Sequence, residues 1–161
     1  RRFGSIHYTK DFKNHFLIKS LGPEPLSDTF DEDYLYKISR GREVPIKTLI
    51  MNSKIVVGIG NIYACEALFD SSIKPTKKAK RITKNDSKAL VTSIKKVLKK
   101  AIKAGGTTLR DYLNPDNSPG YFKVELQVYG RGKKDCLICG KVLKEIRMNN
   151  RSTVFCPNCQ S

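Results

Sequence analysis

The sequence predicts a mainly α fold followed by a short β-hairpin, and three observations support this fold class. Apolar residues recur at helical spacing over residues 83–103, and lysines cover the other faces of that segment. Shorter amphipathic segments over residues 31–70 are separated by glycine and proline. Near its end the chain carries two Cys-x2-Cys pairs with strand-like segments between them. The 161 residues suffice for one ordinary domain or two small ones.

The first and the longest predicted helices have clear boundary signals. Asp31 can cap a helix that runs to about residue 40, and Gly41 follows as its C-cap. Thr83 opens the long helix with Asp86 three residues on, which approximates a capping box. Gly105-Gly106 is predicted to end that helix.

Residues 45–70 are predicted to form two helices joined by glycine turns. Pro45 suits the first turn of one helix, and Asn61 can cap the other, which runs to about Asp70. The turn Gly58-Ile59-Gly60-Asn61 lets the backbone approach a phosphate, and the free amides of the following helix favour an anion. The alternative is a tight helix–helix turn that binds no ligand.

The two Cys-x2-Cys pairs predict a metal site. Each pair places two sulfurs on one tight turn, and two facing turns complete the tetrahedron of a four-thiolate zinc site with no open position for water. Two disulfides are the alternative, but disulfide scaffolds are typical of secreted proteins, and the chain shows no secretory signal. The predicted ligands are Cys136, Cys139, Cys156 and Cys159. Segments 142–147 and 153–155 are the predicted strands, with Asn149-Asn150 at their turn.

Charge points to a polyanionic partner. The chain carries 31 Lys and Arg against 15 Asp and Glu, a formal net charge of +16. Nucleic acid is the most common partner of such a surface, while a membrane surface and simple solubility are the alternatives. No apolar stretch approaches the roughly 20 residues of a spanning helix. Cys65 is predicted to be a buried free thiol, which suits a reducing cytosol.

The residues alone do not indicate a protein-only catalytic site. The two histidines, His7 and His15, both lie in the N-terminal segment, and no Ser-His-Asp set or phosphate-binding loop is present. Arg151 on the hairpin turn could bind a phosphate or could be an ordinary exposed charge. The plain interpretation is a DNA- or RNA-binding module with a zinc hairpin.

Several segments together resemble a known family, in order and over essentially the whole chain. They are Ile46–Met51, Val56–Ala64, Gly105–Tyr112, Leu126–Arg131 and Arg151–Gln160. They resemble bacterial formamidopyrimidine-DNA glycosylase, the bifunctional repair enzyme for oxidised purines. The sister family, endonuclease VIII, shares the helix-two-turns-helix and zinc finger and acts on oxidised pyrimidines. The Leu-Gln-Val-Tyr-Gly and Gly-Gly-Thr-Thr segments are closer to the first family.

The resemblance implies a domain plan. Residues 1–22, extended or loop-like, would be the remnant of an N-terminal β-domain and its linker. Residues 23–106 would form the helix-two-turns-helix domain, residues 107–126 a lesion-recognition loop, and residues 127–161 the zinc-finger β-hairpin. The family's catalytic proline and glutamate belong to a β-sandwich domain upstream that is missing from this chain, so the resemblance implies that residues 1–161 alone lack glycosylase activity.

The resemblance also implies DNA-contacting residues. Arg1 would face the base opposite the lesion, and Phe3 would wedge beside it, although the residues alone also allow Phe3 a place in a core. Arg42 matches a DNA-contacting basic residue, and Lys47 matches a lysine near the lesion phosphates. Asn61 and Tyr63 match the residues of the glycine turn that contact phosphate.

Two further matches concern the lesion itself. Residues 107–122 match the loop that closes over an everted oxidised base. Arg151 matches the zinc-finger arginine that grips phosphate and acts as acid in the final δ-elimination, which makes it the catalytic candidate in this chain. The family often has a glycine before this arginine, whereas the turn here reads Asn149-Asn150-Arg151.

The resulting hypothesis is the DNA-binding part of an enzyme that removes oxidised purines such as 8-oxoguanine and formamidopyrimidines, then nicks the abasic site by β,δ-elimination. This hypothesis includes one structural zinc and a monomeric state. The partner would be a duplex with an oxidised purine or abasic site, with no membrane partner, and the protein would act at the bacterial nucleoid in the cytoplasm. The alternatives are a non-catalytic nucleic-acid-binding zinc module, a ribosomal or structural zinc protein, and the endonuclease VIII type.

Overall fold

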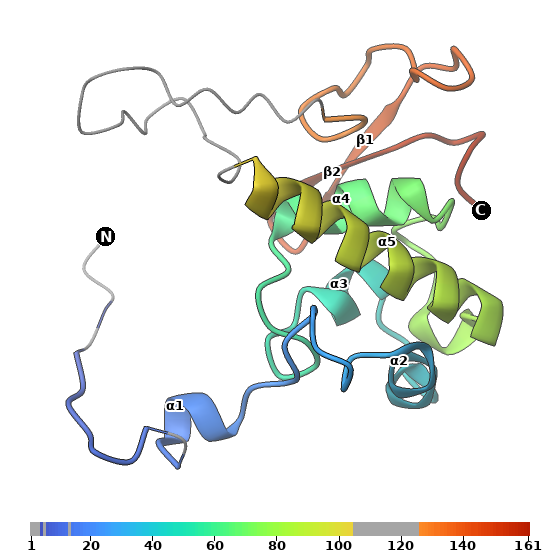
Figure 1. Cartoon of the computed structure of the whole chain (residues 1–161). Helices are drawn as coiled ribbons and strands as arrows, with labels where there is room; N and C mark the ends of the chain where they lie inside the picture. Colours follow the sequence, from blue (N-terminus) through green and yellow to red (C-terminus); the bar gives the residue numbers. More distant parts are fainter. Residues whose placement is uncertain (1–3, 5, 13, 105–125) are drawn as a thin grey trace, which may run out of the picture.

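The computed structural model describes residues 4, 6–12, 14–104 and 126–161. The helices and strands within those ranges form a helical bundle with a small β-hairpin lobe beside it (Figure 1). The elements are α1 (Phe16–Lys19), α2 (Glu32–Ser39), α3 (Ile46–Ile50), α4 (Asn61–Asp70), the short 3-10 helix η1 (Ala79–Arg81), α5 (Lys84–Lys103), β1 (Lys144–Met148) and β2 (Arg151–Phe155). The prediction of a mainly α chain with a terminal hairpin is confirmed.

The predicted helix starts are largely correct because they depend on local caps. The Asp31 side chain accepts a hydrogen bond from the Tyr34 amide at the start of α2. At the start of α5, Thr83 and Asp86 form the reciprocal capping box. The described part of α5 ends at Lys103, and the expected Gly105-Gly106 stop lies outside the described residues.

Two local expectations are wrong. Residues 16–19 form the short helix α1, capped by the His15 side chain, where a loop was expected, and none of its residues is buried. Asn61 does not cap α4; Gly60 takes the cap position, and Asn61 is the first helical residue. The Asn61 side chain is engaged elsewhere, in contacts described below, and a side chain cannot serve both purposes.

The hairpin is a regular antiparallel pair. Its register runs from Lys144 opposite Phe155 to Met148 opposite Arg151. The strands are therefore shifted from the predicted segments by one or two residues, while the predicted turn is confirmed. Asn149 and Asn150 both have positive φ, 49° and 60°. Asparagine tolerates this conformation better than other non-glycine residues, so the two-residue turn closes without a glycine.

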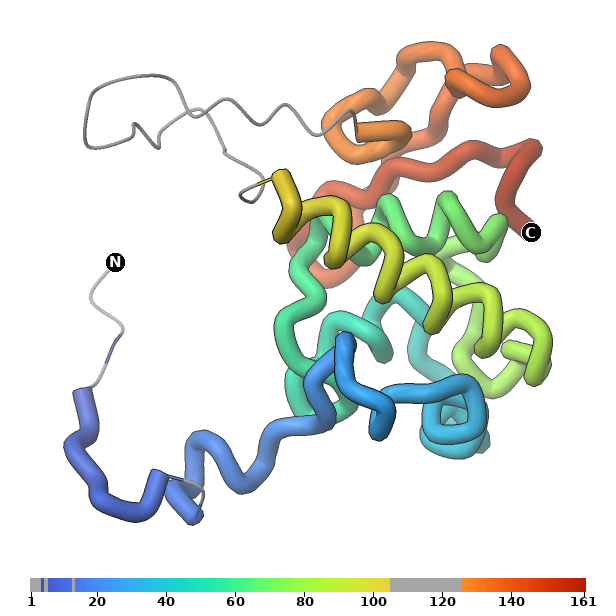
Figure 2. The backbone as a smooth tube through the Cα atoms, viewed as in Figure 1, coloured from blue at the N-terminus to red at the C-terminus, as the bar shows by residue number. Residues whose placement is uncertain are grey.

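Helix α4 connects the two parts because it is buried on nearly every side. Ala64 and Leu68 belong to the core of the helical bundle, which α2, α3 and α5 complete. Cys65 and Phe69 pack instead against Val128, Leu143 and Val154 of the zinc lobe. The chain then returns to the far end of α4, where the Ser161 amide donates to the Ser72 carbonyl (Figure 2). The hairpin is thereby docked against the helices at both ends.

Candidate nucleic-acid interface and metal centre

The four predicted metal ligands lie together. The Sγ atoms of Cys136, Cys139, Cys156 and Cys159 are all within 4.8 Å of one another. Sγ of Cys136 is 3.9 Å from Sγ of Cys159, and Sγ of Cys139 is 3.5 Å from Sγ of Cys156. A disulfide needs about 2.05 Å, so the four thiols are not paired as disulfides.

These sulfurs fit zinc. Zn–S bonds of about 2.3 Å place tetrahedral sulfurs roughly 3.8 Å apart, close to the separations observed. The Lys141 backbone amide lowers the pKa of the Cys139 thiol to about 7. The neighbouring Cys139 in turn raises the pKa of the Cys159 thiol to about 12. Four thiols this close resist joint ionisation unless a cation neutralises them, which is the electrostatic character of a structural metal site.

A second cluster joins the helices to the hairpin through Lys47 of α3. Its side chain is almost fully buried, at 2% exposure. Lys47 Nζ donates to Asn61 Oδ1 at 2.5 Å and to Thr153 Oγ1 at 2.6 Å. Asn61 Nδ2 donates to the Ser152 carbonyl at 2.9 Å. One network therefore ties α3, the start of α4 and strand β2 together.

The Lys47 network forms one wall of an open cleft. This cleft, here called the Lys47 cleft, has a volume of about 320 Å³. It is lined by Lys47, Thr48, Met51, Asn52, Met148, Asn149 and Arg151. Burial lowers the pKa of Lys47, and the nearby Arg151 charge lowers it further, whereas Cys65 opposes the shift. Two cations that face one cleft and repel each other favour an anion between them.

The hairpin turn presents Arg151 to this cleft. Asn149 Nδ2 donates to Thr48 Oγ1 of α3 at 3.0 Å, which fixes the turn against the helix. The Arg151 guanidinium is exposed and makes no hydrogen bond or ion pair with any residue that the structure describes. Helix α4 begins nearby with no side-chain cap, an arrangement that favours anions. The cleft thus offers the free donors of the Arg151 guanidinium on a rigid frame, which suits a phosphate.

Comparison with known proteins identifies this combination of helices and a four-cysteine hairpin. A sequence model described as the formamidopyrimidine-DNA glycosylase H2TH domain matches residues 21–112. A second, described as the zinc finger found in FPG and IleRS, matches residues 133–161. The chain belongs to the formamidopyrimidine-DNA glycosylase family. The zinc-finger match, together with the four clustered thiols, identifies one structural zinc site.

Relatives and solved structures agree with this family. Formamidopyrimidine-DNA glycosylase of Marinomonas sp. (strain MWYL1) is 60% identical over 100% of this chain and 60% of that protein. The Pseudomonas fluorescens enzyme is 50% identical over 100% of the chain and 60% of that protein. The chain therefore spans about 60% of the length of these relatives.

Among solved structures, the MutM (Fpg) protein from Thermus thermophilus has a TM-score of 0.83 at 36% identity, covering 94% of this chain and 57% of that one. The complex of Lactococcus lactis Fpg with DNA containing an abasic site has a TM-score of 0.80 at 36% identity. It covers 90% of this chain and 53% of that one.

The structure brings together only some of the residues that the family resemblance singles out. Lys47 and Arg151 line the Lys47 cleft, and Asn61 accepts a hydrogen bond from Lys47 without lining it. Arg42 is exposed in the loop between α2 and α3 and does not line that cleft, and Tyr63 lines a different groove. Arg1, Phe3 and the loop at 107–122 lie outside the described residues. All of their DNA contacts remain predictions.

Sequence reasoning missed Glu66, which fixes the chain where it enters the zinc lobe. This α4 carboxylate is 7% exposed. Oε2 accepts from the Gln127 amide at 2.8 Å, and Oε1 accepts from the Val128 and Tyr129 amides at 3.0 and 2.8 Å. A single acidic residue within the apolar stretch Ile62–Phe69, in a chain this basic, was the available signal.

We expect Glu66→Ala to destabilise the protein by about 3 kcal/mol or more, because three backbone amides lose a charged acceptor and each costs about 1–3 kcal/mol if left unpaired. Glu66→Gln keeps one acceptor oxygen but turns an NH2 group toward a backbone amide, so its cost should be intermediate. Urea unfolding of the zinc-loaded chain measures both. Equal stability of all three proteins would show that the carboxylate does not hold the lobe.

Proposed function

We propose that this chain is the DNA-binding part of a bifunctional glycosylase and abasic-site lyase that removes oxidised purines. Residues 23–106 would act as the helix-two-turns-helix domain, residues 107–126 as the lesion loop and residues 127–161 as the zinc finger. The single observation that carries the proposal is the Lys47 cleft, where the helices and the zinc hairpin present donors to one space. A DNA backbone that crosses both parts would be gripped by both.

The proposed roles follow from that placement. Lys47, Asn61 and the start of α4 would hold a phosphate, with Tyr63, Arg42, Arg1 and Phe3 as further contacts. Arg151 would bind the next phosphate and serve as the acid of δ-elimination. Such clamps offset the few kcal/mol that extrusion of a nucleotide costs. Solved complexes of Lactococcus lactis Fpg with DNA that contains Fapy-dG or an abasic site support this substrate class.

The proposal extends to the whole protein. Base release would use the proline amine and the neighbouring glutamate of an N-terminal β-sandwich domain, so residues 1–161 purified alone would release no base. Exposed apolar side chains on α1, including Phe16 at 65% and Leu17 at 48%, support the proposal that such a domain packs there. The protein would act as a monomer at the bacterial nucleoid. None of the helices within the described residues has the length and apolar character of a membrane span.

Binding of the zinc-loaded chain to two matched duplexes tests the proposal. One duplex carries an abasic-site analogue and the other is undamaged. We expect the abasic duplex to bind more tightly, because its backbone deforms at lower cost and can enter the Lys47 cleft. Equal binding would favour a nucleic-acid module with no lesion preference, and base release by this chain alone would contradict the assignment of the nucleophile to another domain.

A further inference from the structure

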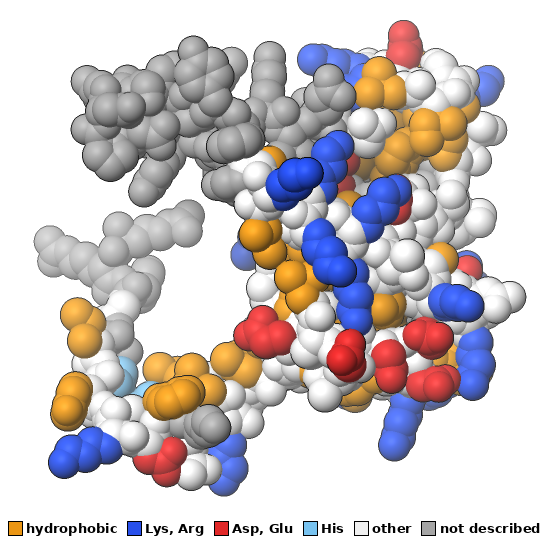
Figure 3. All heavy atoms as spheres, viewed as in Figure 1, with side chains coloured by type: hydrophobic (Ala, Val, Ile, Leu, Met, Phe, Trp, Pro, Cys, Tyr) orange, Lys and Arg blue, Asp and Glu red, His pale blue; other side chains and the backbone are white. Residues whose placement is uncertain are grey.

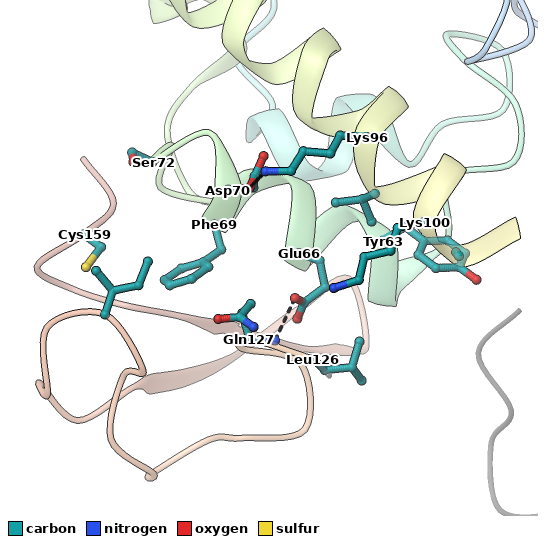
Figure 4. A pocket seen from close by; sticks show the side chains of 13 residues that line it. Tyr63, Glu66, Phe69, Asp70, Ser72, Lys96, Lys100, Leu126, Gln127 and Cys159 are labelled. Atoms are coloured by element: carbon teal, nitrogen blue, oxygen red, sulfur yellow. Dashed lines mark hydrogen bonds and ion pairs between the residues drawn. The ribbon is translucent and has the colours of Figure 1, made fainter. Parts of the chain in front are cut away.

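A second and larger recess lies away from the Lys47 cleft. Here called the α4–α5 groove, it has a volume of about 540 Å³ and lies between α4, α5 and the zinc lobe (Figure 4). Its apolar lining comes from all three parts: Tyr63, Phe69, Val97, Ala101, Leu126 and Ile138. The α4–α5 groove shares no lining residue with the Lys47 cleft.

The lining of the α4–α5 groove carries two carboxylates and two lysines, Glu66 and Asp70 against Lys96 and Lys100, and its unpaired lysines lie at the rim. Asp70 is neutralised by Lys96 at 2.6 Å and also accepts a hydrogen bond from Ser93 at 2.7 Å. Glu66 accepts hydrogen bonds from three backbone amides, which fix its carboxylate on the floor and leave its negative charge in place. Lys100, which also lines the groove, makes no ion pair with any described residue. Lys103 follows it on the same edge of α5 at helical spacing, also exposed.

Exposed apolar side chains and lysines also lie beyond the walls of the α4–α5 groove. Leu137 and Ile138 on the first zinc knuckle are 63% and 71% exposed. In Figure 3 orange apolar side chains gather on the zinc lobe, and blue lysines follow α5 below them. Large apolar side chains that are exposed next to an apolar recess are typical of interaction surfaces. A ligand that used the whole surface would be longer than a small molecule.

We propose that the α4–α5 groove docks an acidic peptide segment of a partner protein. An apolar side chain of the peptide would enter the floor between Phe69 and Ala101, and its carboxylates would pair with Lys100 and Lys103. The exposed Lys100 and Lys103 at the rim, which form no ion pair with any described residue, argue for an acidic partner, and the apolar floor argues for a peptide over DNA. A phosphate backbone would gain nothing from the apolar floor, whereas an acidic peptide with apolar anchors uses both features.

The test uses a fluorescein-labelled peptide, Asp-Asp-Leu-Asp-Asp-Phe-Asp, with the zinc-loaded chain at about 0.15 M salt. Lys100→Glu should weaken binding at least about tenfold, because it reverses the charge on the groove edge. Lys88→Glu is the matched control, since Lys88 is an exposed lysine of the same helix that does not line the groove. It lies roughly 18 Å along α5 from Lys100, more than two Debye lengths of about 8 Å. This variant should bind the peptide like the wild type.

A second peptide, with alanine in place of leucine and phenylalanine, isolates the apolar contribution and should bind clearly more weakly. The proposal is overturned if the first peptide does not bind saturably, if both peptides bind equally, or if both lysine variants weaken binding equally. It is also overturned if undamaged duplex DNA displaces the peptide, because the groove would then be a second DNA surface. Circular dichroism and zinc content of each variant establish that the fold is retained.

Discussion

Removal of zinc is expected to unfold the hairpin lobe and abolish DNA binding while the helical bundle persists. The lobe has few apolar residues of its own, with Val128, Leu143 and Val154 as its buried centre. Zinc binding by comparable small fingers supplies about 10–16 kcal/mol of folding free energy at pH 7. The bundle has a separate core around Leu68 and Leu90, so it should keep its helical circular dichroism. Hydrogen exchange over residues 127–161 should lose protection when zinc is chelated.

The matched pair Cys156→Ser and Cys65→Ser isolates the role of the metal. Both cysteines are 0% exposed, but only Cys156 belongs to the four-thiol cluster. Cys156→Ser should lose zinc and DNA affinity, and Cys65→Ser should retain one zinc per chain. Zinc affinity should also fall as the pH drops, because protons compete for the thiolates, and it should fall more steeply below about 7, where the Cys139 thiolate is protonated as well. Retention of an ordered hairpin in zinc-free Cys156→Ser would contradict the structural role.

The second large effect is expected from Lys47→Met, which should lower DNA affinity at least about tenfold with little change in stability. Methionine has a similar volume and keeps the packing, but it removes the charge and the donor to Asn61 Oδ1. Because burial disfavours the Lys47 charge, the loss of that charge should offset the lost hydrogen bonds. Binding isotherms and urea unfolding on the same samples separate the two effects. A parallel loss of stability and affinity would mean that Lys47 serves the fold alone.

The pH dependence of stability provides a control for Lys47. Its folded-state pKa lies below the usual lysine value of 10.5, so the folded chain binds this proton less tightly than the unfolded chain. Protonation therefore opposes folding fully below the lowered pKa, and the opposition disappears as the pH rises through 10.5. Relative to Lys47→Met, the wild type should gain stability over that window. A constant difference in stability between the two proteins across that pH range would show that burial of the Lys47 charge costs no stability.

Features that depend on residues close in sequence were predictable. The metal ligands follow from the Cys-x2-Cys spacing, and α2 and α5 follow from caps at Asp31 and Thr83. The turn at Asn149-Asn150 follows from residues that tolerate positive φ. Each of these signals lies within a few residues of the structure it specifies, so tertiary contacts did not need to be known.

Contacts between distant segments were not predictable in the same way. Asparagine is a residue type that commonly caps helices, yet the Asn61 side chain binds Lys47 and Ser152, because the hairpin docks at that point. Gln160, which accepts from the Cys156 amide and donates to the Ile73 carbonyl, links the last knuckle to the loop after α4. No local pattern indicates such a partner 87 residues away. Family resemblance supplied Lys47 and Arg151, and the structure supplied the cleft that contains both.

The salt dependence of binding to the abasic duplex tests most directly whether the Lys47 cleft holds the DNA backbone. Arg151→Ala removes the cleft guanidinium, and Arg147→Ala is its matched control, an exposed arginine of the same hairpin that does not line the cleft. Each phosphate contact contributes about 0.9 to the slope of log K against log salt. We predict that Arg151→Ala lowers the slope by about that amount and that Arg147→Ala leaves it unchanged. Equal slopes for all three proteins, or an equal decrease in both variants, would contradict a phosphate site in the Lys47 cleft.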